Sequence, residues 1–301
     1  MKKEKRTDDG GVKRIHVSDV ILAIVMGALC IIFIYPFINI IAISLSSNVM
    51  IGTGSVTWFP KELNAAGYKL VFGKKPIYLA YLNTIKYCVL FALVNVLTTA
   101  MIAYSLTQKE FVLRKLITVL LLFTMFFSGG TVPTYLVVSN LELLNTPWAL
   151  VFPTAVSAYN IFVYRAFFKG ITGDLREAAK IDGAGEFRIL FQIVFPLSKP
   201  LFATFGLFAV VGMWNNYMEP LLYISDAKKQ PIQMVLRNII FQAGGGVTFG
   251  TDYYMLADSG ALNPKNVQYA AIVAATLPIM IFYPFLQKYF VQGVQVGAVK
   301  G

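Results

Sequence analysis

Six stretches of this sequence are long, apolar and free of charged residues, and they restrict the chain to few folds. They cover residues 20–44, 87–106, 116–138, 143–164, 201–218 and 267–287. A helix needs about 20 such residues to cross a bilayer, and a charge at its centre costs about 2.5–3.5 kcal/mol. Only 14% of the residues are charged, against about 25% in soluble domains. We therefore predict an all-α integral membrane protein with six transmembrane helices.

The basic residues predict how these helices are oriented. Seventeen of the 26 Lys and Arg residues fall in the termini and in the loops after the second and fourth stretches, and eight fall in the alternate loops. Because cytoplasmic loops carry an excess of Lys and Arg, both termini are expected in the cytoplasm. The expected organisation is a cytoplasmic tail over 1–19, a transmembrane domain over 20–291 and a cytoplasmic tail over 292–301. Nucleic-acid binding is not predicted from the net charge of +11, because the cations flank apolar stretches instead of sharing one soluble face.

Several of the apolar stretches contain residues that break helices. Pro36 interrupts the first, Ser128-Gly129-Gly130 and Pro133 the third, Pro153 the fourth, and Pro278 and Pro284 the sixth. Backbone groups freed there need partners from neighbouring helices, because lipid offers none. Kinked packing explains such residues, and a break at Gly129-Gly130 that lines a solute path is the alternative.

The charged segment 166–199 separates the fourth and fifth stretches. Asp174, followed three residues later by Glu177, matches a capping box and predicts the start of a helix. Asp182-Gly183 predicts its end, because glycine takes the left-handed turn that other residues resist. Apolar residues on one helical face of 187–195 predict a second helix along the membrane surface or beneath the bundle.

Small residues gather at the expected tip of this segment, namely Ala178, Ala179, Gly183, Ala184 and Gly185. Small side chains let another backbone approach closely, which favours docking into a cleft of a second protein. An ordinary amphipathic loop would also explain both helices, but not the combination of small residues with the acids Glu177 and Asp182. The residues alone identify no partner.

The motif Glu177-Ala-Ala-x-x-Asp-Gly-Ala with Pro196-Leu-x-x-Pro200 resembles the EAA loop of permease subunits of binding-protein-dependent ABC importers. Further segments are similar to the maltose-permease-type carbohydrate group: Asn83-Thr84, Asn160, Trp214-Asn215 and 297–301. Others are similar to the branch that imports complex oligosaccharides: 127–135, 145–149 and 263–267. The resemblance covers residues 15–301. It implies the type I ABC importer permease fold and a bacterial plasma membrane location.

This resemblance implies a mechanical role for the loop. The residues implied to couple the chain to a cytoplasmic ABC ATPase dimer are Glu177, Ala178, Ala179, Asp182, Gly183, Ala184 and Gly185. The C-terminal residues Gly297 and Lys300 would also contact the ATPase. A second homologous permease would complete a heterodimer in the membrane lipid, and an extracytoplasmic solute-binding protein would deliver the sugar.

The sequence contains no pattern for ATP binding, metal binding or catalysis. Gly73-Lys74 and Lys300-Gly301 are the nearest lookalikes of a P-loop, but they have neither its first glycine nor its hydroxyl residue. With one histidine, most metal sites and nucleophile–base pairs are unavailable. We expect a transport subunit and not an enzyme, with no cofactor on this chain and with ATP and Mg²⁺ on the partner ATPase.

Polar and aromatic residues at membrane depth are candidates for sugar contacts, because amides, carboxylates and aromatic faces match sugars. The candidates are Asn83, Tyr135, Asn160, Asn215, Asn216, Tyr217 and Glu219. Hydrogen bonding between helices is the alternative for the asparagines, and an interfacial position in water is the alternative for Glu219. In a heterodimer, the second permease could hold most of the sugar.

Two other classes of membrane protein are alternatives. A secondary transporter or channel that works alone would need inverted repeats and buried acids that couple to ions. The six apolar stretches contain no carboxylate, which disfavours that class. A membrane enzyme would need catalytic groups that converge at one membrane face, and the sequence shows none.

Overall fold

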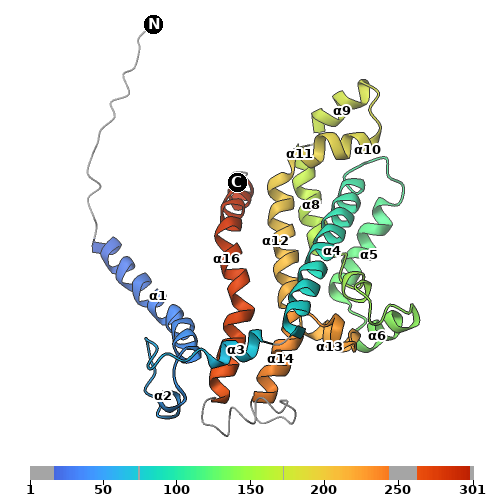
Figure 1. Ribbon diagram of the computed structural model, residues 1–301. Helices are drawn as coiled ribbons and strands as arrows, with labels where there is room; N and C mark the ends of the chain where they lie inside the picture. The colour runs from blue at the N-terminus through green and yellow to red at the C-terminus, as the bar shows by residue number, and fades with distance from the viewer. Residues whose placement is uncertain (1–16, 74, 172, 244–262, 299–301) are drawn as a thin grey trace.

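The computed structural model shows a chain that is helical throughout its regular structure, over the residues it describes: 17–73, 75–171, 173–243 and 263–298. Side chains are described for these residues except 75–76, 242–243 and 282–298. The longest helices run lengthwise through the molecule, and short helices gather at its two ends (Figure 1). The predicted all-α architecture is confirmed for the described residues.

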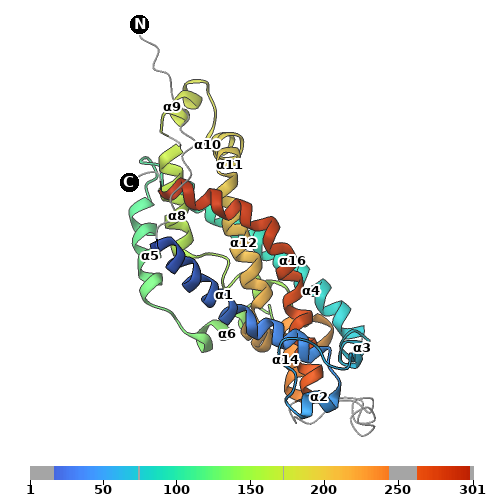
Figure 2. The same ribbon diagram turned by 90° about the vertical axis from the view of Figure 1, so that its left-hand side faces the viewer.

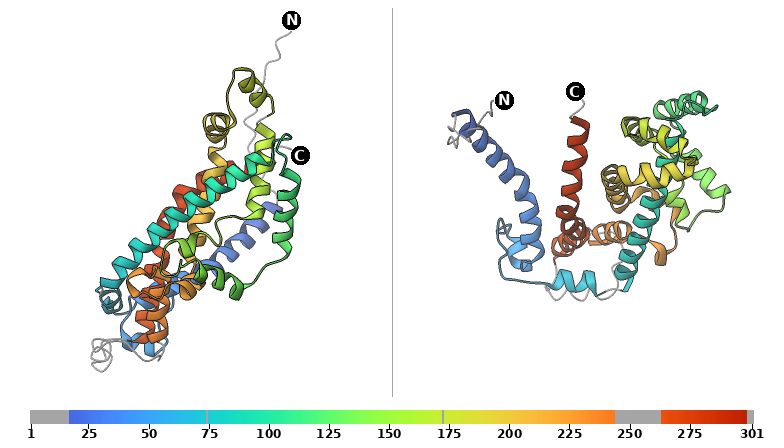
Figure 3. Two further views of the ribbon diagram at one scale, coloured as in Figure 1. Left: turned by 90° about the vertical axis from the view of Figure 1, so that its right-hand side faces the viewer. Right: turned by 90° about the horizontal axis from the view of Figure 1, so that it is seen from above.

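Four long helices form the frame of the molecule. They are α1 (Val17–Ser44), α4 (Lys75–Ser105), α12 (Lys199–Asn215) and α16 (Pro264–Ala298). Helix α12 packs against α4 on one side and α16 on the other, while α1 packs only against the α16 side of the molecule (Figures 2 and 3). The first two expected spans and the last two therefore each contribute one long helix.

The prolines of the first and last spans do not break their helices. Helix α1 is continuous through Pro36 and α16 is continuous through Pro278 and Pro284, so the predicted interruptions of the first and sixth spans are wrong. A proline removes one backbone donor, and local adjustment with neighbouring side chains satisfies the freed carbonyl in transmembrane helices.

The third and fourth spans are broken. Helix α5 (Arg114–Phe126) is separated from α6 (Thr131–Asn140), and α7 (Trp148–Val151) is separated from α8 (Ala158–Ile171). The first break contains Gly130 at φ +84°, a left-handed conformation that glycine adopts without steric cost. The second contains Pro153. Both breaks were predicted from these residues.

Within the described residues, two helices are long and apolar enough to cross a membrane by themselves, Val17–Ser44 and Ile77–Ser105. A third span would come from the pair Glu186–Leu197 and Lys199–Asn215, whose two halves meet at an angle of 82°. Because of this bend, the first half lies across the end of the bundle while α12 runs through it (Figure 1).

Short helices mark the two ends of the bundle. One end carries α9 (Gly173–Ile181), α10 (Glu186–Ile189), a π-turn (Leu190–Val194) and α11 (Phe195–Leu197). The opposite end carries α2 (Asn48–Gly52), α3 (Ala66–Phe72), α13 (Met218–Tyr223), a 3₁₀ turn (Ala227–Lys229) and α14 (Ile232–Ala243) (Figure 1). The two ends of the bundle are therefore built from different sets of short helices.

Small residues allow the long helices to pack closely. Ala100 and Ala103 of α4 are fully buried against α8 residues, and Ala270 and Ala271 of α16 are buried in a second cluster. Small side chains at helix contacts let backbones approach in membrane proteins. The amide of Asn95 adds a bond between helices, since its Nδ2 donates to the carbonyl of Ala155 at 2.8 Å.

Helix α1 keeps its apolar side chains on the outside. Ile24, Ile32 and Phe33 are each more than 60% exposed, a degree that water would not tolerate over a whole helix. A helix that is apolar all round is typical of a membrane span, so this surface is suited to lipid or to another apolar helix.

Candidate functional site

The segment predicted to dock on a partner forms two short helices at one end of the bundle. Helix α9 begins at Gly173, so Asp174 lies in its first turn and does not precede the helix as a cap, contrary to the prediction. An acid in the first turn still interacts favourably with the positive end of the helix dipole. Residues 186–197 then form the second helical run, which the sequence predicted over 187–195.

The turn between the two helices is built on Gly183. Its φ is +76°, its N–H donates to the carbonyl of Lys180 at 3.0 Å, and the N–H of Ala184 donates to that of Ala179 at 2.9 Å. This pair of bonds is a Schellman motif, which ends a helix with a left-handed glycine. The predicted turn at Asp182-Gly183 is confirmed.

The small residues of the tip face two ways. Glu177, Ala178, Asp182, Gly183 and Gly185 are exposed. In contrast, Ala179 and Ala184 are half-buried and pack against the apolar core of the bundle, so the prediction that all five small residues form the exposed tip is wrong. The hydrophobic contact that accompanies a Schellman motif draws these two alanines inward.

Large apolar side chains flank this tip, and the sequence reasoning did not predict that they would be exposed. Ile181 is 87% exposed and Phe187 is 72% exposed. Leu190 and Val194 of the second helical run are buried, whereas Phe187 and Phe191 are exposed, so the predicted apolar face is only partly turned to the core. The π-turn shifts the register of side chains between these positions.

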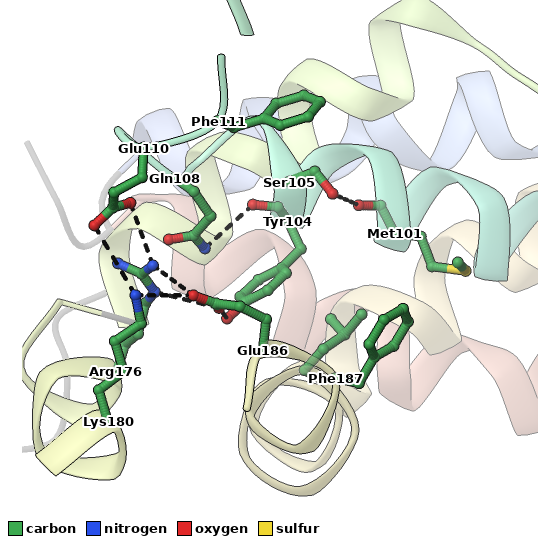
Figure 4. A pocket seen from close by; sticks show the side chains of 11 residues that line it. Met101, Tyr104, Ser105, Gln108, Glu110, Phe111, Arg176, Lys180, Glu186 and Phe187 are labelled. Carbon is green, nitrogen blue, oxygen red and sulfur yellow. Dashed lines mark hydrogen bonds and ion pairs between the residues drawn. The ribbon is translucent and has the colours of Figure 1, made fainter. Parts of the chain in front are cut away.

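An ion-pair network holds α9 against α10. Nη2 of Arg176 lies 2.6 Å from Oε1 of Glu186, and Nζ of Lys180 lies 2.9 Å from the same oxygen. Tyr104, near the end of α4, donates its hydroxyl to Oε2 of Glu186 at 2.6 Å. Arg176 also reaches Oε2 of Glu110 at 3.3 Å. Figure 4 shows Tyr104, Arg176 and Lys180 reaching Glu186, while Glu110 faces Arg176 from its other side.

The pKa values of the network follow from these contacts. Burial by itself raises the pKa of Glu186, but the hydrogen bonds from Arg176, Tyr104 and Lys180 outweigh it and lower the pKa to about 2. The hydrogen bond to Glu186 raises the pKa of Arg176. Both groups are therefore charged at neutral pH, and each stabilises the other's charge.

The network borders a cavity of about 350 Å³ between the loop and the end of α4 (Figure 4). Its walls include Met101, Gln108 and Leu190 together with the charged side chains. None of the network residues was predicted from sequence. The spacing of Arg176 and Lys180, which places both cations on one helical face, was the available signal.

The predicted substrate contacts come from several separate helices and turns of the chain. Nδ2 of Asn83 donates to the carbonyl of Lys228 at 2.8 Å, and the ring of Tyr135 stacks on Tyr223 with centroids 6.1 Å apart. The backbone N–H of Asn160 donates to Oγ of Ser157 at 3.4 Å. These three residues lie apart from one another, and Asn83 and Tyr135 make structural contacts.

The candidates that follow Trp214 are closer together. Asn215 and Tyr217 line one cavity of about 520 Å³, and Nδ2 of Asn216 donates to Oε2 of Glu219 at 2.7 Å. At the C-terminus, Gly297 lies in the last turn of α16, and Lys300 lies outside the described residues. Over the part of the chain that was searched, no group of three or more His, Cys, Asp or Glu side chains could hold a metal ion.

The profile of the family described as "Binding-protein-dependent transport system inner membrane component" matches residues 77–296. The chain belongs to this family. It is therefore a membrane transport component and not an enzyme. The match includes the α9–α10 loop, both broken spans and the long helices α4 and α12.

Relatives within this family cover nearly the whole chain. Protein LplC of Bacillus subtilis (strain 168) is 40% identical over 288 residues, which are 95% of this chain and 96% of LplC. The polygalacturonan/rhamnogalacturonan transport system permease protein YtcP of the same organism is 37% identical over 89% of this chain and 93% of YtcP. The melibiose/raffinose/stachyose import permease protein MelC is 30% identical over 88% of this chain.

A solved structure shows the same fold. A chain of a bacterial ABC transporter involved in the import of the acidic polysaccharide alginate superimposes with a TM-score of 0.85 and 28% sequence identity. The superposition covers 93% of this chain and 99% of that chain. This structural similarity confirms the predicted type I permease fold.

Proposed function

We propose that this chain is the permease subunit of an ATP-driven, binding-protein-dependent importer of oligosaccharides. The observation that carries the proposal is the Gly183 loop, which is exposed at its tip and tied by Glu186 to both α9 and α4. Family membership and relatives named for saccharide transport support the same function.

The proposed topology has six spans with both termini in the cytoplasm. The basic segments place the α9–α10 end of the bundle on the cytoplasmic side. The broken pairs α5–α6 and α7–α8 would each count as one span, and α1, α4, α12 and α16 would supply the others. This arrangement leaves α2, α3, α13 and α14 on the outer side, where a solute-binding protein would deliver the sugar.

The coupling mechanism follows from the contacts of the loop. Glu177, Ala178, Asp182, Gly183 and Gly185 form the exposed surface that would enter a groove of the ATPase. The hydroxyl of Tyr104 and the inward alanines bind the loop to α4 and to the core. A displacement of α9 by the ATPase would therefore move α4, and with it α12, instead of being absorbed by a loose loop.

The remaining partners complete the transporter. A second homologous permease would pair with this chain as a heterodimer, and a cytoplasmic ABC ATPase dimer would bind ATP and Mg²⁺. Gly297 and Lys300 are proposed to approach the same ATPase. Membrane lipid would cover the exposed apolar side chains of α1 and α5 that the second permease leaves free.

Co-purification with transport measurement tests this function. The tagged chain, expressed with the proteins encoded beside it, should copurify with an ATPase and a second permease and should take up oligosaccharide into vesicles only with ATP. Uptake by the chain alone without ATP would show a secondary transporter.

A Gly183→Trp variant tests the coupling role of the loop. It should insert and assemble normally but hydrolyse ATP without uptake, and normal uptake in that variant contradicts the coupling role.

A further inference from the structure

An open cavity at the outer end of α12 lies between three helices. Its walls come from the C-terminal end of α12, from α14 and from α16, and α14 packs beside α16 (Figure 1). Asn215 closes α12, about 24 Å along the helix axis from Lys199 at 1.5 Å per residue. The cavity therefore opens near the outer end of the proposed span, and its volume of about 520 Å³ suits a sugar unit.

A hydrogen bond between two helices fixes one wall of this cavity. Nε1 of Trp214 donates to the carbonyl of Ala275 at 3.2 Å in a buried position. That bond ties the end of α12 to the middle of α16, so Asn215 stays next to Ala275 and Thr276 in the cavity wall. A site built between packed helices keeps its geometry without a ligand.

Five polar side chains from three helices and a turn line the cavity, namely Asn215, Tyr217, Gln233, Arg237 and Thr276. Nδ2 of Asn215 donates to the carbonyl of Val211, which leaves its Oδ1 to accept from a ligand. Arg237 is exposed and has no ion-pair partner among the residues whose side chains are described.

The charge of the lining selects between classes of sugar. The described lining contains a guanidinium and no carboxylate. A guanidinium offers parallel N–H donors that match the two oxygens of a carboxylate, whereas a neutral sugar presents only hydroxyls. Arg237 is exposed at the outer end of the bundle, so its guanidinium is accessible to a ligand. The hydroxyl of Thr276 donates to the carbonyl of Ile272 within its own helix, and the other lining residues, including Leu236, Ile240 and Ala271, are apolar.

We propose that this cavity binds a uronic-acid unit of a transported oligosaccharide, with Arg237 pairing with its carboxylate. Asn215 and Gln233 bind its hydroxyl groups, and Tyr217 supplies a ring face. The proposal rests on the proposed function, because it assigns the substrate class of that importer. It adds Arg237 and Gln233, which the sequence reasoning did not single out, to the predicted contacts Asn215 and Tyr217.

The test uses the complete importer with its binding protein in proteoliposomes. The probes are trigalacturonate and the neutral trisaccharide that carries hydroxymethyl groups in place of the carboxylates. Arg237→Gln should slow ATP-dependent trigalacturonate uptake by about tenfold or more, the scale of a lost hydrogen bond to a charged group. Lys228→Gln removes the same charge from the same end of the molecule, outside the cavity, and should leave uptake unchanged.

A second variant keeps the proposal testable if Arg237→Gln fails to assemble. Arg237→Lys preserves the charge but not the paired donors, so it should raise the KM for trigalacturonate. Unchanged uptake in Arg237→Gln, an unchanged KM in Arg237→Lys, or a wild-type importer that takes up only the neutral trisaccharide overturns the proposal while the importer function stands. Absence of ATP-dependent uptake of any saccharide overturns both.

Discussion

Nη2 of Arg176 in α9 lies 2.6 Å from Oε1 of Glu186 in α10, on the far side of the turn made by Gly183. The same carboxylate accepts the hydroxyl of Tyr104 from α4. One acidic side chain therefore joins the two helices of the loop to each other and to a long helix of the bundle. The loop is a braced element of the fold, and its exposed tip is held at a set angle to the helices.

Loss of the ion-pair network around Glu186, called the brace below, should loosen α9. Arg176→Gln removes the shortest contact to Glu186, so amide hydrogen exchange in α9 should speed up by about tenfold, the scale of one hydrogen bond between charged groups. Arg188→Gln is the matched control, because Arg188 lies in the same loop and bonds only to Gln192 among the described contacts. Equal exchange in the two variants would contradict the brace.

The hydroxyl of Tyr104 should contribute to the stability of the folded protein. Tyr104→Phe removes one hydrogen bond to a carboxylate and should destabilise the protein by about 1–2 kcal/mol. In Tyr164 the hydroxyl is buried without a hydrogen-bond partner in the described structure, so Tyr164→Phe should be neutral or stabilising. Thermal unfolding in detergent measures both, and a larger loss in Tyr164→Phe would show that the assigned bonds are wrong.

Alanine substitutions at two glycines of the loop distinguish backbone strain from the steric effect of an added side chain. A methyl group at either Gly183 or Gly185 would meet no atom within 4 Å, but only Gly183 has a left-handed φ, at +76°. Gly183→Ala should therefore destabilise the loop by about 1 kcal/mol, whereas Gly185→Ala, at a φ of −72°, lacks this strain and should lose only the smaller preference for glycine at an N-cap. Exchange rates of residues 179–185 report the difference. Identical rates in the two variants would argue against the Schellman turn.

The brace should be insensitive to pH near neutrality. The pKa of Glu186 falls from 4.5 to about 2 in the folded protein, so its stabilising contribution is complete above about pH 4.5 and is lost as the pH falls from there towards 2. The groups that face it are Arg176, Lys180 and Tyr104, with Glu110 behind Arg176. Protection of α9, corrected for intrinsic exchange, should stay constant between about pH 6 and 8. A fall in protection across that interval would contradict the assignment.

Close packing between α3 and α16 gives a prediction remote from the loop. A methyl group at Gly67 would collide with the side chain of Asn266, whose Nδ2 donates to the carbonyls of Ser44 and Ser46. Gly67→Ala should therefore destabilise the fold by about 1–3 kcal/mol, as overpacking does. Gly52→Ala, at a site with no atom within 4 Å, is the control, measured by the same thermal unfolding. Similar midpoints in both variants would contradict this contact.

The sequence by itself determined the features that depend on residues close together along the chain. Hydrophobic length predicted the long helices, helix breakers predicted the interruptions at Gly130 and Pro153, and Asp182-Gly183 predicted the turn that the Schellman motif makes. These properties follow from local backbone chemistry and the cost of charge in lipid. The loop motif also pointed to the family, which the comparisons confirm.

Only the tertiary structure decided which residues meet across the chain. Tyr104 and Glu186 are 82 positions apart, and the cavity near Arg237 is lined by residues of three helices. Helical spacing indicates which residues share a face but not which helix packs on that face, because the choice depends on crossing angles and side-chain volumes of the whole bundle. For the same reason the inward turn of Ala179 and Ala184, and the unbroken path of α1 through Pro36, were not predictable from their own segments.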